Sequence, residues 1–129
     1  MMWTTRISEV LDVRPGDGIG YNSLYSAPER MRLAALPVGY ADGLPRKLSS
    51  TNEVEGGWVM VRGKKAPIVG RVSMNLTMVD VSAIDRVEPG DEVTLLGEGV
   101  TADDHARIAG TIAYEIICGV RADERVLRP

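Results

Sequence analysis

The sequence has almost none of the residues that build disulfides and common metal sites. Among its 129 residues are one cysteine, Cys118, and one histidine, His105. A single cysteine cannot form an internal disulfide, and the usual zinc sites need several cysteine or histidine ligands. We therefore expect no metal site and a cytoplasmic protein. Cys118 is expected to be a small buried hydrophobic residue, and His105 a surface residue.

The sequence also lacks a strong excess of charge and any long apolar run. Fifteen basic residues against 18 acidic residues give a net charge of −3, so neither nucleic acid nor an anionic membrane is a favoured partner. The apolar runs are far shorter than the roughly 20 residues that cross a bilayer, and we expect no membrane contact. A chain of this length is predicted to form a single domain, residues 1–129.

Aromatic residues are few, with no phenylalanine, two tryptophans and four tyrosines. An interior built from Val, Ile, Leu, Met and Ala favours short strands. The expected fold is mainly β, a compact β-barrel-like domain with one or two short helices near the C-terminus. Because such a core does not need aromatic rings, the tyrosines are candidates for roles that use their hydroxyl groups. The predicted strands are residues 3–13, 19–22, 31–38, 58–61, 65–72, 92–96 and 125–128.

The stretch from Val72 to Met78 alternates apolar and polar residues, as does a strand with one buried face. The alternation changes phase at Val79, which predicts a bulge or tight turn between Asn75 and Val79. Bends of this kind expose backbone N–H groups and often lie beside functional sites. An ordinary pair of core strands is the plainer interpretation of the same pattern.

A first helix is predicted over residues 102–109. Thr101 and Asp104 have the spacing of a capping box, in which each side chain binds the backbone N–H of the other. Gly110 is a typical residue just after the end of a helix.

A second helix is predicted over residues 111–118, because apolar residues recur there at helical spacing. On a helical wheel Tyr114 lies roughly 130° from the centre of this apolar stripe. The tyrosine is therefore expected to point towards solvent or another protein surface. The stripe expected to face the core consists of Ile112, Ala113, Ile116 and Ile117.

No complete active site can be assembled from the sequence motifs. There is no Ser/His/Asp arrangement in a suitable context, no phosphate-binding P-loop and no G-x-G-x-x-G dinucleotide motif. A tyrosine is a chemically possible base, but its ordinary pKa is about 10, so it needs nearby positive charge or a hydrogen-bond partner. The residues around Tyr21 supply neither. If Tyr21 takes part in chemistry, the cofactor and the groups that tune its pKa lie elsewhere.

Five blocks of sequence follow one another over nearly the whole chain. They are Gly20-Tyr21, residues 38–43 with Arg46, residues 66–74, residues 90–93 and residues 110–118. In order and spacing they resemble the C-terminal domain of alanine racemases. Five blocks in the correct order are a more specific signal than any one of them.

The resemblance implies half of a fold-type III enzyme that depends on pyridoxal 5'-phosphate and interconverts L- and D-alanine, a source of D-alanine for peptidoglycan precursors. In that family an N-terminal (β/α)8 barrel, absent from this chain, holds the cofactor on a lysine. The C-terminal domain reaches into the barrel of the partner subunit of a homodimer. Its partners are thus a small amino-acid substrate and that barrel. The isolated chain is expected to be inactive and not to bind the cofactor covalently.

The resemblance also implies roles for four residues. Tyr21 matches the catalytic tyrosine, the base on one face of the substrate Cα, while the barrel lysine acts on the other face. Met74 matches the residue whose backbone N–H helps bind the substrate carboxylate. Tyr40 and Tyr114 match two tyrosines at the inner gate of the substrate corridor, and Tyr114 also matches a residue near the cofactor phosphate.

Three positions depart from the family pattern. The family usually has Ser-Tyr-Gly where this chain has Gly20-Tyr21-Asn22, and an aspartate beside the corridor where this chain has Asn75. Its closing Arg-Val-Pro-Arg motif appears here as Arg-Val-Leu-Arg at residues 125–128, displaced by about two residues. The change at Asn75 removes a charge near the corridor. These departures leave a serine-preferring or broad-specificity racemase, soluble or membrane-anchored, as an alternative. A non-catalytic β domain used for association is a second alternative.

Overall fold

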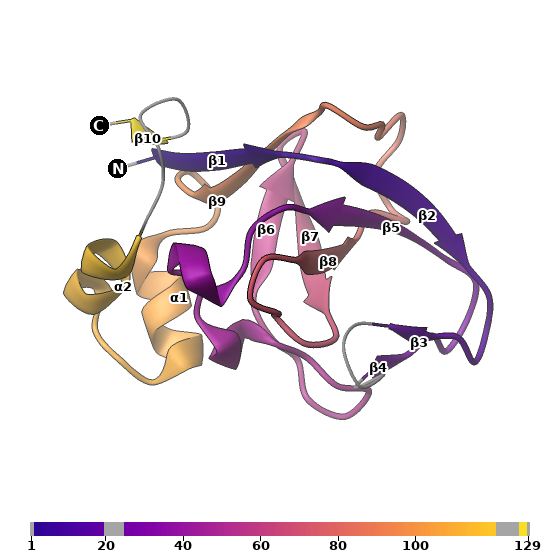
Figure 1. Ribbon diagram of the computed structural model, residues 1–129, viewed down its shortest axis with the longest axis horizontal. Coiled ribbons are helices and arrows are strands. Elements are labelled where there is room, and N and C mark those ends of the chain that lie inside the picture. Colours follow the sequence, from indigo (N-terminus) through magenta and orange to yellow (C-terminus); the bar gives the residue numbers. More distant parts are fainter. Residues whose placement is uncertain (1, 20–24, 121–126, 129) are drawn as a thin grey trace.

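The computed structural model describes residues 2–19, 25–120 and 127–128, the last two for their backbone only. These residues form a mainly β fold with two short helices near the C-terminus, as predicted (Figure 1). The strands are β1 (Met2–Arg6), β2 (Glu9–Val13), β3 (Gly18–Ile19), β4 (Tyr25–Ser26), β5 (Met31–Leu36), β6 (Trp58–Val61), β7 (Lys64–Val69), β8 (Thr77–Asp80), β9 (Glu92–Leu96) and β10 (Leu127–Arg128). The helices are the 3-10 turns η2 (Tyr40–Asp42) and η3 (Arg46–Leu48), and α1 (Ala102–Ala109) and α2 (Ala113–Gly119).

The main sheet is antiparallel, and the chain itself closes it into a barrel-like shape. Its strand order is β10-β1-β9-β6-β7-β8-β5-β2, so β1 and β2 lie towards opposite ends of the sheet although they are consecutive in sequence. Between them, the Ile7 N–H donates to the Asp91 carbonyl and the Ser8 N–H donates to the Ala35 carbonyl, both at 2.9 Å. The predicted strand 3–13 is therefore one long run, bent at this point, that joins the two halves of the sheet (Figure 1).

Strand β5 contributes to two hydrophobic clusters because its side chains alternate between the two faces of the sheet. Ala34 and Leu36 belong to the main cluster, and Leu33 and Ala35 belong to a second one. All four are buried. The second cluster includes Ile19 of β3 and Ala27 just after β4, so it attaches the small β3–β4 pair to the outside of the sheet. Both faces of this one strand are thus needed to hold the fold.

The prediction of a strand over residues 72–78 is wrong for the first part of that range. Residues 70–76 form a loop, and the strand β8 begins only at Thr77. The Ser73 N–H donates to the Leu76 carbonyl at 3.0 Å and closes a tight turn with Met74 and Asn75 at its tip. The apolar side chains of Met74 and Leu76 are exposed rather than buried on one face. The predicted bend is nevertheless present, at Asn75.

The first helix has the predicted bounds because its ends are defined by local hydrogen bonds. The Asp104 N–H donates to the Thr101 hydroxyl at 3.1 Å, and the Thr101 N–H donates to the Asp104 carboxylate at 2.8 Å. Gly110 ends the helix in the left-handed conformation, with φ of 74°. The predicted capping box is thus confirmed.

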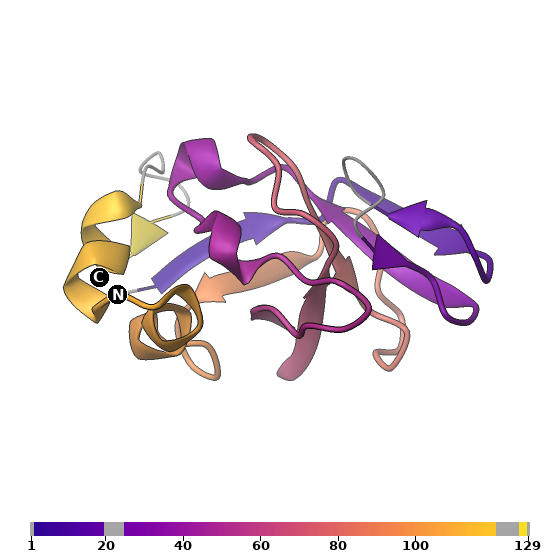
Figure 2. The same cartoon turned by 90° about the horizontal axis from the view of Figure 1, so that it is seen from below.

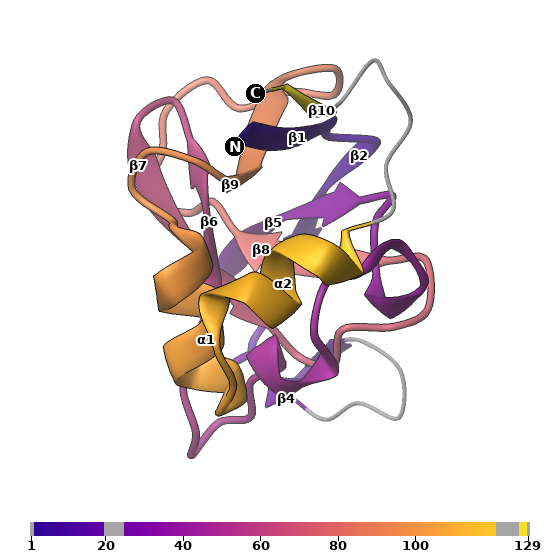
Figure 3. The same cartoon turned by 90° about the vertical axis from the view of Figure 1, so that its left-hand side faces the viewer.

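The second helix begins at Ala113, two residues later than predicted, and its apolar stripe is mostly outside the core. Ile116 is buried, but Ile112 is 65% and Ile117 42% exposed. In Figure 3, α2 lies across one end of the barrel beside α1. A seven-residue helix in that place has only one side covered, so helical spacing alone overestimated its burial. Tyr114 is 73% exposed, as expected.

Two single-residue expectations are wrong. His105 is buried, at 1% exposure, because it lies with Ala106 and Ala109 on the inward side of α1. Cys118 is exposed, because it lies on the uncovered side of α2. In the described ranges no group of three or more His, Cys, Asp or Glu side chains is placed to hold a metal ion. Nor do these ranges contain a helix long and apolar enough to cross a membrane.

Candidate active site

Two of the predicted site residues, Tyr40 and Met74, lie on turns that bind each other through the backbone. The Tyr40 N–H donates to the Ser73 carbonyl at 3.0 Å, and the Ala41 N–H donates to the Met74 carbonyl at 3.1 Å. Figure 2 shows η2 and the loop before β8 on the same side of the sheet. Tyr40 is 40% exposed and Met74 52% exposed, so both side chains are open to a partner.

Gly39 allows this close approach because it has no side chain. A Cβ at this position would lie 2.0 Å from the Ser73 carbonyl oxygen and 2.5 Å from that of Met74. The Gly39 N–H donates to the Asp42 carboxylate at 3.0 Å, which shapes η2. Backbone atoms cannot move aside as a side-chain tip can, so glycine is required here.

The tip of the Met74 turn has a backbone donor that binds none of the described residues. Met74 and Asn75 are both exposed, and no described residue accepts a hydrogen bond from the Met74 N–H. An open N–H at the tip of a turn suits an anionic group such as a carboxylate. The geometry is therefore compatible with the role expected of Met74.

Tyr114 lies on α2, which touches η2 through glycines. Gly43 ends η2 with a positive φ of 102°, and a Cβ on it would lie 2.1 Å from the Gly119 carbonyl oxygen. Gly119 is the last residue of α2. The elements that carry Met74, Tyr40 and Tyr114 thus form one connected series, although the backbone contacts join only neighbours in it.

Tyr21 lies outside the described residues, so its geometry stays untested. The strands on either side of it are described: Gly18 pairs with Ser26 and Ile19 pairs with Tyr25. Ile19 is buried in the second hydrophobic cluster. The residues on either side of the segment 20–24 are therefore attached to the fold.

Residues 1–128 match the family of the alanine racemase C-terminal domain. The chain belongs to this family. The alanine racemase of Halothermothrix orenii is 48% identical over 124 residues, which cover 93% of this chain and 31% of that protein. That of Geobacter sulfurreducens is 49% identical over 113 residues, covering 84% of this chain and 28% of the relative. The chain thus spans less than a third of the length of these relatives.

Solved structures agree with this family membership. The alanine racemase of Clostridium difficile 630 in complex with cycloserine superposes with a TM-score of 0.85 at 36% identity, covering 93% of this chain and 31% of that one. The alanine racemase of Bartonella henselae with covalently bound pyridoxal phosphate gives a TM-score of 0.84 at 30% identity, covering 92% and 32%. The racemase domain fold is therefore shared over nearly the whole of this chain.

Arg46 joins the candidate site of the racemase domain, although it was not among the predicted site residues. Its guanidinium carbon lies 5.0 Å from the centre of the Tyr40 ring, a cation–π distance. A cation over the ring face restricts how the tyrosine can turn. The signal in the sequence was the place of Arg46 at the end of one of the five matched blocks.

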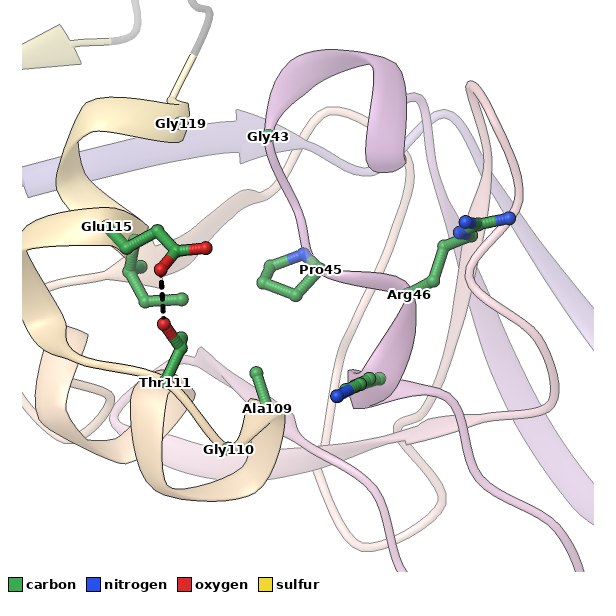
Figure 4. Close-up of a pocket in the computed structure, with 10 residues that line it drawn as sticks. Gly43, Pro45, Arg46, Ala109, Gly110, Thr111, Glu115 and Gly119 are labelled. Atoms are coloured by element: carbon green, nitrogen blue, oxygen red, sulfur yellow. Dashed lines mark hydrogen bonds between the residues drawn. The ribbon is translucent and has the colours of Figure 1, made fainter.

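A groove beside η3 shares only Arg46 with these residues. It has a volume of about 630 Å³ and lies between η3 and the α1–α2 pair. The Thr111 hydroxyl donates to the Glu115 carboxylate at 2.6 Å on one side of it, while the Arg46 side chain turns away (Figure 4). The residues that line it are Gly43, Pro45, Arg46, Lys47, Ala109, Gly110, Thr111, Glu115, Ile116 and Gly119. The rings of Tyr40 and Tyr114 and the Met74 turn take no part in it.

An apolar hollow of about 420 Å³ lies closer to the candidate site. It is lined by Gly18 and Ile19 of β3 and by Ser73 and Leu76 of the Met74 turn, among others. The strand that leads to Tyr21 and the turn that carries Met74 therefore border the same space.

Proposed function

We propose that this chain is the C-terminal domain of an alanine racemase that depends on pyridoxal 5'-phosphate, and that it supplies one of the two bases. The observation that carries the proposal is the family match over residues 1–128, with alanine racemases as the matched relatives. The docking of the Tyr40 turn on the Met74 turn supports it, because two predicted site residues are brought together.

Tyr21 is the proposed base. Racemisation inverts a carbon centre, so a proton must leave from one face of Cα and return to the other, which needs two groups on opposite faces. The bound cofactor would draw electrons away from Cα and make its proton acidic. Tyr21 would take or return the proton on one face. A phenol with an ordinary pKa of about 10 needs a cation or a hydrogen-bond partner to act as a base near neutral pH.

The other candidate residues would bind and orient the substrate. The open Met74 N–H would donate to the substrate carboxylate. The exposed side chains of Tyr40 and Tyr114 would line the path to the site, with Tyr114 beside the cofactor phosphate. Asn75 beside Met74 is neutral and does not repel a carboxylate.

The cofactor would be held covalently by another part of the enzyme. The three lysines of this chain, Lys47, Lys64 and Lys65, are all exposed, and Lys65 lies over the Trp58 ring at 4.2 Å. The N-terminal barrel that supplies the lysine, and a homodimer in which this domain faces the partner's barrel, are part of the proposal. The single domain of residues 1–129 and a cytoplasmic location, which suits the exposed free thiol of Cys118, are proposed with it.

Replacing Tyr21 by phenylalanine in the full-length enzyme tests the proposal. The change removes only a hydroxyl, so we expect an intact fold and unchanged visible absorbance of the cofactor. Racemisation should fall by about 10²- to 10⁴-fold, the usual effect of losing a general base. In deuterium oxide, one alanine enantiomer should still exchange its Cα proton while exchange from the other stops. Racemisation at the wild-type rate would contradict the role of Tyr21 and favour an association domain.

Serine is the alternative substrate, and Asn75 is the reason to test it. Its amide can donate to a substrate hydroxyl, which an aspartate cannot do. We expect Asn75→Asp to lower the ratio of serine to alanine kcat/KM in the full-length enzyme. A ratio that does not change means that Asn75 only shapes the turn.

A further inference from the structure

One segment, which we call the brace and define as residues 46–52, contacts the supports of three candidate site residues. It begins with Arg46, whose guanidinium lies over the Tyr40 ring. It ends with Asn52, whose side chain binds Ser26 of β4. In Figure 1 the chain after η3 runs below the sheet to reach β4. The brace thus extends from the Tyr40 turn to the strand that follows Tyr21.

The middle of the brace is tied to the loop that leads to Met74. The Val72 N–H donates to the Ser49 hydroxyl at 2.8 Å. The Ser50 hydroxyl donates to the Ile68 carbonyl at 2.8 Å and accepts from the Gly70 N–H at 3.1 Å. Ser50 is buried. The brace is therefore held in a fixed relation to the start of the Met74 loop.

Asn52 then acts as a two-point clamp on β4. The Ser26 N–H donates to the Asn52 amide oxygen at 2.8 Å, and the Asn52 amide nitrogen donates to the Ser26 carbonyl at 2.6 Å. The Asn52 amide thus makes the same pair of hydrogen bonds to Ser26 that the backbone of a neighbouring strand would make. Among the described residues, these two are the hydrogen bonds that join β4 to the rest of the domain, apart from those to its partner β3.

The β3–β4 pair needs such a clamp. Each strand has two residues, and a two-stranded ribbon is at best marginally stable by itself. Ile19 and Ala27 bind the pair to the sheet through apolar contacts, which are not directional. The hydrogen bonds from Asn52 to the backbone N–H and carbonyl of Ser26 also fix the orientation of β4. A catalytic group has to be held to within about 0.5 Å of its working position.

We propose that Asn52 is a positioning residue for the tyrosine base: it fixes Ser26, and through β3–β4 the residues Ile19 and Tyr25 on either side of the segment that contains Tyr21, relative to the Met74 turn. This inference rests on the proposed function of Tyr21. Asn52 touches neither substrate nor cofactor. It acts by keeping the two strands that flank the base at a constant separation from the carboxylate-binding turn.

The clamp can be removed without rearranging its own loop. The Thr51 hydroxyl accepts the N–H groups of Glu53 and Val54 at 3.1 and 3.0 Å, which holds the turn around Asn52. Asn52 itself is exposed. Asn52→Ala therefore deletes the two bonds to Ser26 and leaves the turn in place. Glu53→Ala removes a neighbouring exposed side chain with no part in the clamp and is the matched control.

The test compares these variants in the full-length enzyme. We expect Asn52→Ala to lower kcat for alanine about tenfold, since misplacing a reacting group by about 1 Å costs up to about 10²-fold. KM should stay within about twofold, and the visible absorbance of the cofactor should not change. Asn52→Asp keeps the acceptor for the Ser26 N–H but loses the donor, so its kcat should be intermediate. Hydrogen exchange of the Ser26 amide should speed up in Asn52→Ala, and Glu53→Ala should match wild type in every measurement.

A double variant decides whether Asn52 acts through Tyr21. In a Tyr21→Phe background, Asn52→Ala should cause no further loss of the residual rate, because the base it positions is already gone. A wild-type kcat in Asn52→Ala, or an equal further loss in the Tyr21→Phe background, overturns the inference and leaves the proposed function standing. If Tyr21→Phe itself racemises alanine at the wild-type rate, the proposed function and this inference both fall.

Discussion

His105 is the buried titratable side chain of the described residues, and it has no hydrogen-bond partner on either ring nitrogen. Burial lowers its pKa below the ordinary value, because a charged imidazole loses its hydration inside the core. The Leu95 carbonyl, which lies towards the ring without the geometry of a hydrogen bond, and the Asp104 carboxylate both act in the opposite direction. The balance favours a neutral histidine, so the residue packs as a polar member of the core.

The chain should lose stability as the pH falls below about 6.5, the ordinary pKa of histidine. Below this pH the His105 side chain binds a proton in the unfolded chain but stays neutral in the folded chain. The free energy of unfolding therefore falls by at most about 1.4 kcal/mol per pH unit, until the pH reaches the lower pKa of folded His105. Above about 6.5 both states are neutral and the effect is absent. We expect His105→Leu to flatten the dependence of the free energy of urea unfolding on pH between 7.5 and 5.5.

The pH range of 7.5 to 5.5 is chosen so that the carboxylates Asp91 and Asp104 stay ionised throughout the measurement. The pKa of each is lowered in the folded state, first of all by a backbone hydrogen bond, from Glu88 and Thr101 respectively. They add a loss of stability only at more acidic pH, near and below the ordinary pKa of aspartate. Equal slopes for wild type and His105→Leu between pH 7.5 and 5.5 would contradict the prediction.

Among the elements, η2 and the Met74 turn behave as one unit. Two backbone hydrogen bonds join them, and the Thr77 hydroxyl donates to the Val38 carbonyl at 2.7 Å just beside the joint. Each turn also has a second support, since η2 meets α2 at Gly43 and the Val72 N–H before the Met74 turn donates to Ser49. At the joint between the two turns the smallest residue, Gly39, controls their separation.

Gly39→Ala should separate the two turns. The added methyl meets two backbone oxygens well inside contact distance, and overpacking of this kind costs about 1–3 kcal/mol. In the full-length enzyme we expect a higher KM for alanine, because the Met74 N–H is displaced from the substrate carboxylate. Gly119→Ala is the control, since a Cβ there meets nothing within 4 Å. Steady-state kinetics and thermal unfolding of both variants check this, and an unchanged KM in Gly39→Ala would count against the role given to the Met74 turn.

For the molecule as a whole, the barrel-like sheet is complete within this chain, but the proposed active site is not. The bent β1–β2 run closes the sheet, and its interior is filled by the main hydrophobic cluster. In contrast, Tyr40, Met74 and Tyr114 are all exposed on the surface. A barrel-like fold whose described candidate site residues are exposed is suited to complete a site on another domain.

The isolated chain should therefore neither racemise alanine nor bind pyridoxal phosphate covalently. Its three lysines are all exposed, so none is favoured as an attachment site. After incubation with the cofactor and reduction with borohydride, mass spectrometry should find no stoichiometric adduct at one lysine. The full-length enzyme, treated in the same way, is the positive control. A single modified lysine in this chain, together with turnover, would contradict the prediction.

The sequence by itself determined the features that depend on hydrogen bonds between residues a few positions apart in the chain. The helix at 102–109 follows from the capping box of Thr101 and Asp104 and from Gly110. The strands predicted over residues 58–61 and 65–72 correspond to the β6–β7 hairpin, although β7 begins at Lys64 and ends at Val69; the structure shows a two-residue turn in which Arg62 and Gly63 both have positive φ. Family membership was also accessible, because five separated blocks keep their order. In each case the information lies within a few residues, or in the identity of the residues themselves.

The tertiary structure alone decided which apolar residues are buried and which turns meet. Met74 and Leu76 read as the buried face of a strand but lie on an exposed turn, and His105 reads as a surface residue but lies in the core. The contact of η2 with the Met74 turn, and the clamp of Asn52 on Ser26, join residues 26 or more positions apart. Burial and such contacts depend on which elements pack together, and no local pattern carries that information.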